Sequence, residues 1–266
     1  PEEFIANRCF EAAQKIYFPA VHTREPYASS RGAKRSPMYE REVELGGYFM
    51  ELGGWERAHG YKANEHLLEK YGDRVPVREN EWDNRHFWRV SNAEHLAMSE
   101  DCGIVNLSHF HMVDIEGPDH VELLEWLCAA KIGGDANIGK GIYTHFLDDE
   151  GMVRADFTVF RMADRCRLVN GADAGPRDFH YMKRVAQDRG LDVTITDTSE
   201  KYITIGIWGP NARVNLQKVV DEPDALLAEN FPFAAIRPIR IAGKDVTAFR
   251  ISSPRLSPTP RRPSWR

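Results

Sequence analysis

Apolar and polar residues alternate along several stretches of the second half of the chain, and between these stretches apolar residues recur at helical spacing. Alternation predicts strands at residues 104–116 and at about 141–147, 152–161, 165–170, 192–197, 202–208, 234–241 and 245–252. Helical spacing predicts helices at about 91–100, from 117, at about 177–189 and from 210. The strands follow one another mainly as hairpins, with helices between groups of them, which predicts an α+β fold with a largely antiparallel sheet.

The first ninety residues show less regularity. Residues 1–40 are predicted to be irregular because three internal prolines interrupt them. The paired glycines at 46–47 and 53–54 predict bends or close approaches of the backbone. The first helix is expected to begin at a capping box, in which the side chains of Ser91 and Glu94 would bind backbone amides of the first turn.

Aromatic residues concentrate around this glycine-rich stretch, at Trp55, Trp82, Trp88, Tyr48, Phe49 and Phe87. Packing in a core or between domains is the default interpretation of such a cluster, and a ligand site in which rings stack is the alternative. A nucleotide site of the βαβ type is not expected, because the chain contains neither G-x-G-x-x-G nor G-x-x-x-x-G-K-[ST].

Composition and charge narrow the class of protein. The 266 residues are 42% hydrophobic and 28% charged, which excludes intrinsically disordered and collagen-like chains. The formal net charge of −5 argues against a nucleic-acid-binding protein. Four scattered cysteines without a C-x-x-C pair predict free thiols in a reducing compartment. Because no apolar run reaches the roughly 18–20 residues of a membrane helix, we expect a soluble, cytoplasmic protein, or a mitochondrial matrix protein in a eukaryote.

Asp156 is the acidic residue that stands out in the pattern. It lies in the middle of a predicted strand whose apolar face carries Val153, Ala155, Phe157 and Val159, so its side chain projects from the opposite face. A carboxylate in this position is unusual, because aspartate has a low β propensity and is costly to bury. Asp156 either lies on the solvated face of a half-exposed sheet or lines a pocket, where it would bind an amine or direct a proton transfer.

Other polar residues give weaker signals. His109 and His111 are predicted to share one strand face beside Ser108, and such a pair can form one edge of a metal site. No third ligand follows at a suitable spacing, so ordinary sheet histidines and no metal are expected. Residues 148–151 predict a hairpin turn with solvated acids rather than a calcium site. Without a G-x-S-x-G motif, a Ser-His-Asp hydrolase has no support.

Several longer segments, in order, resemble a known family. They are Cys102-Gly-Ile-Val-Asn-Leu-Ser-His-Phe, Val113-Asp-Ile-Glu-Gly-Pro-Asp, Gly139-Lys-Gly-Ile-Tyr-Thr, Asp149-Glu-Gly-Met-Val-Arg-Ala-Asp-Phe-Thr-Val and Ile205-Gly-Ile-Trp-Gly-Pro-Asn-Ala-Arg. They are similar to the folate-binding glycine cleavage T-protein (aminomethyltransferase) family. Upstream, Met38-Tyr-Glu-Arg-Glu, Gly53-Gly-Trp-Glu-Arg and Asn80-Glu-Trp-Asp-Asn-Arg-His-Phe-Trp resemble its dimethylglycine and sarcosine dehydrogenase branch. In that branch, this part follows an FAD-dependent amine oxidase.

The resemblance implies a T-protein-like folate-binding fold and transfer of a one-carbon unit from the iminium of an oxidised N-methyl amine to tetrahydrofolate. The family's catalytic aspartate falls on Asp156, which is implied to lie near the reactive amine nitrogens of tetrahydrofolate and to assist attack on the iminium carbon. Tyr143 and Leu107 stand where family members line the folate pocket, and Asn106 replaces a frequent acid. FAD is implied only in a missing N-terminal dehydrogenase domain or in a partner subunit.

The resemblance also predicts how the chain is organised. Residues 1–89 are expected to be the tail end of an FAD-dependent oxidoreductase-like region with a linker, residues 90–252 an incomplete T-protein-like domain, and residues 253–266 a disordered tail. In the family, a G-E-x-G-W/F-E motif that binds the pterin stands where this proline- and arginine-rich tail begins. We therefore expect a frameshift or a mispredicted end, with a C-terminal barrel-like domain truncated. A stand-alone tetrahydrofolate-dependent demethylase and a catalytically dead folate-binding or structural fragment are the alternatives.

Overall fold

The computed structural model describes residues 2–17, 27–77, 79–80, 88–172 and 174–251. Its helices are α1 (Glu2–Tyr17), α2 (Tyr39–Glu44), α3 (Leu67–Tyr71), α5 (Arg89–Glu100), α6 (His120–Leu127), α7 (Gly175–Asp188) and α8 (Ala212–Gln217). Its strands are β1 (Gly47–Leu52), β2 (Trp55–Tyr61), β3 (Gly103–Asn106), β4 (His111–Glu116), β5 (Lys140–Leu147), β6 (Val153–Arg161), β7 (Arg165–Asn170), β8 (Thr194–Asp197), β9 (Ile205–Trp208), β10 (Ile236–Ile241) and β11 (Lys244–Phe249). Two aromatic residues of the predicted cluster, Trp82 and Phe87, and the predicted tail at 253–266 lie outside the described residues.

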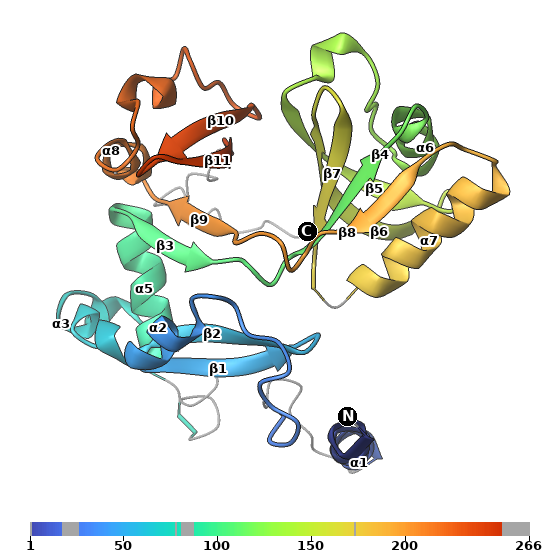
Figure 1. Ribbon diagram of the computed structural model, residues 1–266. Helices are drawn as coiled ribbons and strands as arrows, with labels where there is room; N and C mark the ends of the chain where they lie inside the picture. Colours follow the sequence, from blue (N-terminus) through green and yellow to red (C-terminus); the bar gives the residue numbers. More distant parts are fainter. Residues whose placement is uncertain (1, 18–26, 78, 81–87, 173, 252–266) are drawn as a thin grey trace, which may run out of the picture.

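Three groups of elements surround the short antiparallel ladder of β3 and β9 (Figure 1). The first group is a five-stranded sheet with α6 and α7, and the second is the β1–β2 hairpin with α2, α3 and α5. The third is the β10–β11 hairpin with α8. The predicted α+β class is confirmed. None of the described helices has the length and apolar character needed to cross a membrane.

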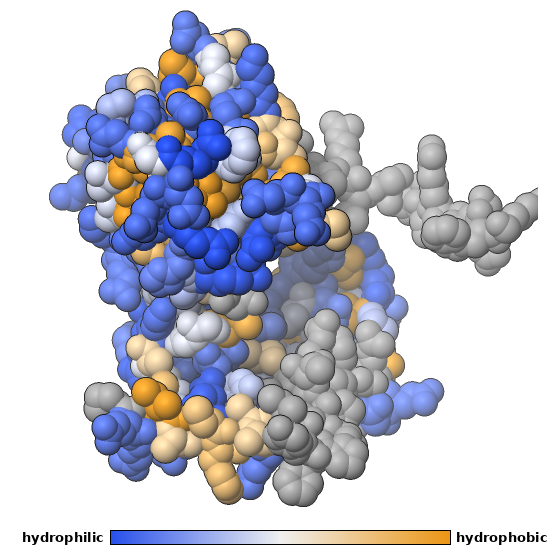
Figure 2. Space-filling model, turned by 90° about the vertical axis from the view of Figure 1, so that its right-hand side faces the viewer, coloured by the Kyte–Doolittle hydropathy of each residue, from blue (hydrophilic) through white to orange (hydrophobic). Residues whose placement is uncertain are grey.

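The five-stranded sheet has the order β5-β6-β7-β4-β8, and every neighbouring pair is antiparallel. Side chains from one face of this sheet pack with those of α6 and α7 in a core that includes Phe146, Phe157, Leu168, Leu124 and Met182. Figure 2 is turned toward this side of the molecule, where mainly hydrophilic residues cover the upper part of the surface. The apolar side chains of α6 and α7 therefore pack against one face of the sheet, and polar side chains lie on the opposite face.

The predicted single strand at residues 104–116 is wrong, because the structure divides it into β3 and β4. A turn separates the two, closed by a hydrogen bond from the amide of Phe110 to the carbonyl of Leu107 (N···O 3.0 Å). Strand β3 pairs with β9, whereas β4 pairs with β7 and β8. Apolar residues recur at alternate positions on both sides of the turn, at Val105, Leu107, Val113 and Ile115, with His109 and His111 between them. This recurrence alone does not show where the pairing partner changes. The other predicted strands and helices are confirmed, with ends shifted by a few residues.

The prediction that residues 1–40 are irregular is wrong for Glu2–Tyr17, which form helix α1. No proline falls within this segment, so the prolines further along the chain have no bearing on it. Glu2 and Glu3 lie in its first turn and Lys15 in its last turn, the arrangement that the helix dipole favours.

Helix α5 begins at Arg89, and the predicted capping box is wrong. The hydroxyl of Ser91 donates a hydrogen bond to the carbonyl of His59 (2.6 Å). The carboxylate of Glu94 accepts hydrogen bonds from the amide of Tyr61 and from the side chain of Asn64. Both side chains therefore fasten the helix to β2 and the segment after it, a tertiary use that the local pattern does not show. The predicted bends are confirmed, with positive φ angles at Gly46, Gly53 and Gly54.

The β10–β11 hairpin contacts the five-stranded sheet through backbone hydrogen bonds at the start of β5, such as that from the amide of Ile236 to the carbonyl of Gly139 (2.7 Å), and through one aromatic residue. The rings of Phe249 in β11 and Phe160 in β6 lie with centroids 4.9 Å apart. The Phe249 ring also lies against Gly141 of β5, where a Cβ atom would collide with it. The glycine thus allows the third group to close against the sheet at the edge of its polar face.

Candidate functional site

Alternate residues of β5, β6 and β7 point away from α6 and α7 and form a surface that we call the polar face. Its central members are Tyr143, His145, Asp156, Thr158 and Arg167. The strand register places His145 opposite Asp156 and Tyr143 opposite Thr158. Phe157 and Val159 project to the other side and are buried in the core. The structure thus places Asp156 on the face that alternation predicts.

Asp156 is exposed, and among the described residues one side chain, that of Tyr143, forms a hydrogen bond with it. The hydroxyl of Tyr143 donates a hydrogen bond to its Oδ2 atom (3.1 Å). This bond and the negative charge of Asp156 raise the pKa of Tyr143, so the phenol stays protonated and acts as a donor. The Tyr143 ring is 62% exposed and stands edge-on to His145. The pair therefore presents a negative charge and an aromatic surface to solvent.

A buried ion pair lies further along the same face. Arg167 of β7 binds Asp114 of β4 through two hydrogen bonds of 2.7 and 2.8 Å, and both side chains are 7% exposed. Arg167 also donates a hydrogen bond to the hydroxyl of Tyr202 (2.7 Å), whose ring packs 4.0 Å from the guanidinium. The bonds to Asp114 raise the pKa of Arg167. Sequence reasoning missed this group, because its members are up to 88 residues apart and follow no motif.

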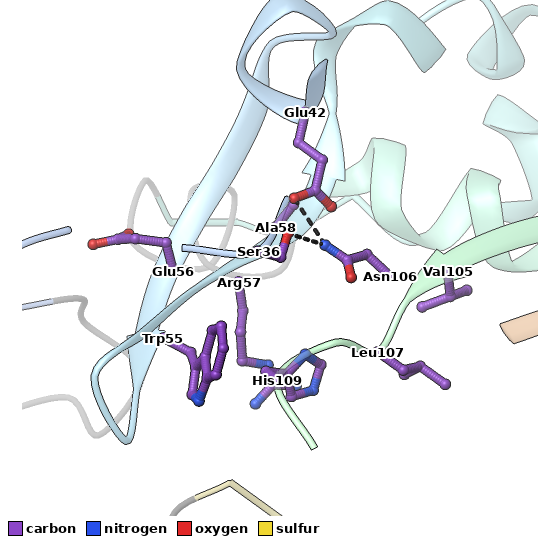
Figure 3. A pocket seen from close by; sticks show the side chains of 10 residues that line it. All are labelled: Ser36, Glu42, Trp55, Glu56, Arg57, Ala58, Val105, Asn106, Leu107 and His109. Atoms are coloured by element: carbon purple, nitrogen blue, oxygen red, sulfur yellow. Dashed lines mark hydrogen bonds between the residues drawn. The ribbon is translucent and has the colours of Figure 1, made fainter. Parts of the chain in front are cut away.

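Leu107 does not lie on the polar face: it lines a cavity of about 90 Å³ between α2, β2 and the turn after β3. The residues around this cavity are Ser36, Glu42, Trp55, Glu56, Arg57, Ala58, Val105, Asn106, Leu107 and His109 (Figure 3). The structure therefore joins two of the predicted site residues, Asp156 and Tyr143, by a hydrogen bond, and places the third in a separate hollow.

The cavity contains a hydrogen-bonded polar group. The side-chain amide of Asn106 donates to the hydroxyl of Ser36 (2.8 Å) and to the carboxylate of Glu42 (3.1 Å), as Figure 3 shows. The hydroxyl of Tyr61 donates to the other oxygen of Glu42 (2.7 Å). Asn106, noted in the sequence as a replacement for an acid, thus binds an acid that comes from α2.

The two histidines of the predicted H-x-H pair lie in different environments. His109 belongs to the turn after β3 and lines the cavity, whereas His111 opens β4 and is buried against Gly175. Nε2 of His111 lies 3.3 Å from Oδ2 of Asp197. The prediction of a shared strand face is wrong, because the chain turns between the two residues. Within the part of the chain that the structure describes, no cluster of His, Cys, Asp and Glu is placed to hold a metal.

The remaining sequence signals have structural explanations. Oδ1 of Asp148 accepts hydrogen bonds from the amides of Glu150 and Met152, so residues 148–151 form the predicted turn between β5 and β6. Trp55 is buried, at 8% exposure, and forms one wall of the cavity. All four cysteines are free thiols, as predicted.

Comparison with known proteins settles the family. The profile of the family described as "GCVT N-terminal domain" matches residues 38–253. The chain belongs to this family. The chain is 28% identical over 225 residues to "4-methylaminobutanoate oxidase (formaldehyde-forming)" of Paenarthrobacter nicotinovorans, covering 84% of this chain and 26% of that protein. It is 30% identical over 201 residues to "Dimethylglycine dehydrogenase, mitochondrial" of Rattus norvegicus, covering 75% of this chain and 22% of that protein.

A solved structure shows the same fold. The glycine cleavage system aminomethyltransferase T from Bartonella henselae superposes with a TM-score of 0.58 at 21% identity. The match covers 77% of this chain and 47% of that protein. The resemblance to the T-protein family, in the dehydrogenase branch, is confirmed. The chain spans about a quarter of the length of the related oxidase and of the related dehydrogenase.

Proposed function

We propose that this chain binds tetrahydrofolate on the polar face and transfers to it a one-carbon unit from the iminium of an oxidised N-methyl amine. The observation that carries the proposal is the exposed carboxylate of Asp156, which stands on a sheet strand and is hydrogen bonded by Tyr143. Membership of the GCVT N-terminal domain family supports it.

The residues of the polar face fit a reduced folate. A carboxylate accepts the N–H groups that line one edge of a pterin, and the exposed ring of Tyr143 offers a flat surface for stacking. Phe160 and Phe249 supply further aromatic surface at the edge of the sheet. Tetrahydrofolate would supply the amine nitrogens that take up the carbon.

Asp156 has two roles in this proposal. Its negative charge stabilises the positively charged iminium and the transition state for attack on the iminium carbon. It also accepts the proton that the attacking amine loses as the new C–N bond forms, and returns a proton to the nitrogen of the donor amine, which leaves as the original C–N bond breaks. Tyr143 is a positioning residue: it holds Oδ2 and leaves Oδ1 of Asp156 available to the ligands.

The names of the two relatives indicate the class of amine. Both 4-methylaminobutanoate and dimethylglycine are amino acids methylated at nitrogen, and we propose iminium donors of this class for this chain. An FAD-dependent dehydrogenase domain or subunit would generate the iminium. In this arrangement, residues 1–89 would adjoin the dehydrogenase and residues 90–252 would carry the folate site.

Titration of the purified chain with tetrahydrofolate, followed by an assay of methylenetetrahydrofolate formation from formaldehyde, tests the proposal. Asp156→Asn is expected to lower the catalysed rate by about 10²–10⁴-fold, the usual contribution of a general base. Asp164→Asn is the matched control, because Asp164 is an exposed acid in the turn at the other end of β6. It is expected to leave the rate unchanged.

Each outcome decides between functions. Unchanged turnover in Asp156→Asn would remove Asp156 from the mechanism. Absence of tetrahydrofolate binding would overturn the proposal and favour a dead or structural fragment. Transfer from a methylated donor without any oxidising partner would favour a stand-alone demethylase.

A further inference from the structure

A groove lies on the helix side of the five-stranded sheet, away from the polar face. It has a volume of about 300 Å³ and is formed by α6, α7 and the turn from β5 to β6. Figure 2 is turned toward this side of the molecule and shows hydrophobic residues exposed among hydrophilic ones. Trp126 of α6 lines the groove and is 54% exposed. Tryptophan is mostly buried in folded proteins and is enriched where two proteins meet, so its exposure here indicates a contact surface.

The groove carries charges of both signs that lack a partner. Arg154 and Arg184 line it, and their guanidinium groups pack on the Tyr181 ring, 4.5 and 5.4 Å from its centroid. Asp149 and Asp188 line it as well. None of these four charged side chains forms an ion pair with another residue that the structure describes. Because two positive and two negative charges cancel, a strongly acidic or a strongly basic partner would be repelled by half of them.

The other two charged residues of the groove have partners within the chain. Oδ1 of Asp148 accepts hydrogen bonds from two backbone amides of its own turn. Arg189 lies 3.7 Å from a carboxylate oxygen of Glu122 and packs on the Trp126 ring, 3.8 Å from its centroid. These contacts shape the groove and leave the four unpaired charges to an outside partner.

Two of the unpaired charges lie on one face of α7. Arg184 and Asp188 are four residues apart, about one helical turn, so their side chains leave the helix on the same side. Asp188 is the last residue of α7, where the helix dipole disfavours a negative charge. A pair in which the basic residue comes first is also weaker than one in the reverse order. Both residues therefore gain more from opposite charges on another molecule than from each other.

We propose that this groove is the contact surface between two copies of the chain, with α7 packed antiparallel against α7 of the partner. A two-fold axis midway between residues 184 and 188 places Arg184 opposite the partner's Asp188, and Asp188 opposite the partner's Arg184. One patch thus supplies both halves of two ion pairs, which a partner of single charge cannot do. Trp126 lies beside these pairs and is covered by the second copy.

The position of the groove separates this pairing from the proposed chemistry. The polar face lies on the opposite side of the sheet, so two copies joined through α7 leave Asp156 accessible. A contact built around one helix is small beside the roughly 1,200–2,000 Å² of a standard interface, and we expect association at about micromolar concentrations. Folate binding is measured on the polar face, so failure of one proposal is distinguishable from failure of the other.

Sedimentation of the full chain over a series of concentrations tests the pairing. The unaltered chain is expected to pass from monomer to dimer as its concentration rises, and salt is expected to weaken the dimer because it screens the ion pairs. Arg184→Asp and Asp188→Arg each place like charges across the two-fold axis, and each should weaken the dimer by about tenfold or more. The matched control is Arg213→Asp, because Arg213 is an exposed cation on α8, and it should leave the dimer unchanged.

Mixing the two single variants gives the sharpest result. Arg184→Asp leaves acids at both positions and Asp188→Arg leaves arginines at both, so the mixture should form a heterodimer about as stable as the parent dimer. Circular dichroism shows that each variant is folded. A chain that stays monomeric at every concentration, a dimer indifferent to the single variants, or a mixture of folded variants that does not associate would overturn the pairing.

Hydrogen exchange on the unaltered chain keeps the test independent of the variants. Amides at the C-terminal end of α7 should exchange more slowly at concentrations where the dimer forms, and amides of α8 should not change. Dimer formation without slower exchange in α7 would place the contact elsewhere and overturn the inferred surface.

Discussion

The five-stranded sheet and the β1–β2 hairpin with its neighbouring helices are held together by different interactions. In the sheet region, Phe146, Phe157, Leu123 and Leu124 are almost completely buried between β-strands and helices. In the hairpin region, the apolar cluster consists of Tyr71, Val75 and Ala93 with a few half-buried neighbours. Buried polar contacts, such as those of Glu42 and Glu56, make up much of the packing there.

This difference explains which region of the molecule the sequence describes well. An apolar core depends on the spacing of apolar residues within each helix or strand, and this spacing can be recognised in a short stretch of sequence. A buried carboxylate depends on donors that arrive from distant segments: Glu56 binds Arg31, and Glu42 binds Asn106. Such partners have no fixed spacing, so the hairpin region and its cavity are visible only in three dimensions.

Phe157→Ala is expected to have the largest effect on stability. Phe157 is 1% exposed, and its ring stacks on Phe146 with centroids 4.1 Å apart. Truncation leaves a cavity and should lower the free energy of unfolding by about 3–5 kcal/mol, measured by chemical denaturation. Ile5→Ala is the control, because Ile5 is 60% exposed in α1, and its effect should stay within about 0.5 kcal/mol. A loss below about 1 kcal/mol in Phe157→Ala would refute a core-dependent sheet region.

Arg31→Met tests the polar region and should cost less, about 2–3 kcal/mol, because it leaves the buried Glu56 carboxylate with the Gly32 amide as its remaining donor. The Arg31 side chain is 31% exposed, so water offsets part of the loss. The double variant with Glu56→Met should be less destabilised than the sum of the two single variants. Simple additivity would show that the ion pair contributes nothing to holding the hairpin region.

Two acids of the hairpin region should give opposite pH dependence. Burial alone would raise the pKa of Glu56, but the hydrogen bonds from Arg31 and Gly32 outweigh it and the pKa is lowered. Burial raises the pKa of Glu94 in spite of hydrogen bonds from Asn64 and Tyr61. Glu56 therefore adds stability above the ordinary pKa of 4.5, and this is lost as the pH falls through the lowered value. Glu94 stabilises the fold below 4.5 and loses this contribution as the pH rises through its raised value.

The difference appears on comparing glutamine variants with the parent chain between about pH 3 and pH 7. As the pH rises, Glu56→Gln should become less stable relative to the parent chain, whereas Glu94→Gln should become more stable. Denaturant midpoints at a series of pH values measure both trends. The two variants should differ because, among the described residues, Glu56 is paired with a positive charge and Glu94 is not. The same trend in both would contradict this explanation.

Tyr143→Phe should have the smallest effect on stability, within about 0.5 kcal/mol, because the ring is 62% exposed and its hydroxyl bonds an exposed carboxylate. If Tyr143 positions Asp156, the same variant should reduce the proposed transfer several-fold while thermal unfolding stays unchanged. An unchanged transfer rate would show that Tyr143 does not position Asp156 for the reaction. A large loss of stability would mean that the polar face contributes to folding.

Much of the sheet region could be predicted from the sequence. Alternation placed Phe157 and Val159 in the core and Asp156 on the opposite face, and helical spacing found α7, with Met182 and Val185 buried. The site residue Tyr143 was assigned by resemblance, and the structure adds its hydrogen bond to Asp156. Its role and that of Asp156 in the reaction stay predictions.

The failures have a common physical cause. Ser91 and Glu94 form a capping motif in the sequence, but the distant partners His59 and Tyr61 take both side chains. The segment from 104 to 116 has apolar residues at alternate positions toward both ends, with His109 and His111 between them, and its two halves pair with different strands. In each case, a contact between distant segments decides the structure and the local pattern is satisfied by both alternatives.

Strand β6 links the folding of the chain to its proposed chemistry. Phe157 and Asp156 are neighbours on a ladder in which side chains alternate strictly, so a slip of one residue would exchange them and place a carboxylate in the core. Such a misaligned chain would lose the stacking of Phe157 on Phe146 and bury an uncompensated charge. Core packing therefore fixes the orientation of the carboxylate on which the proposed reaction depends: a molecule that folds stably has Asp156 pointing outward.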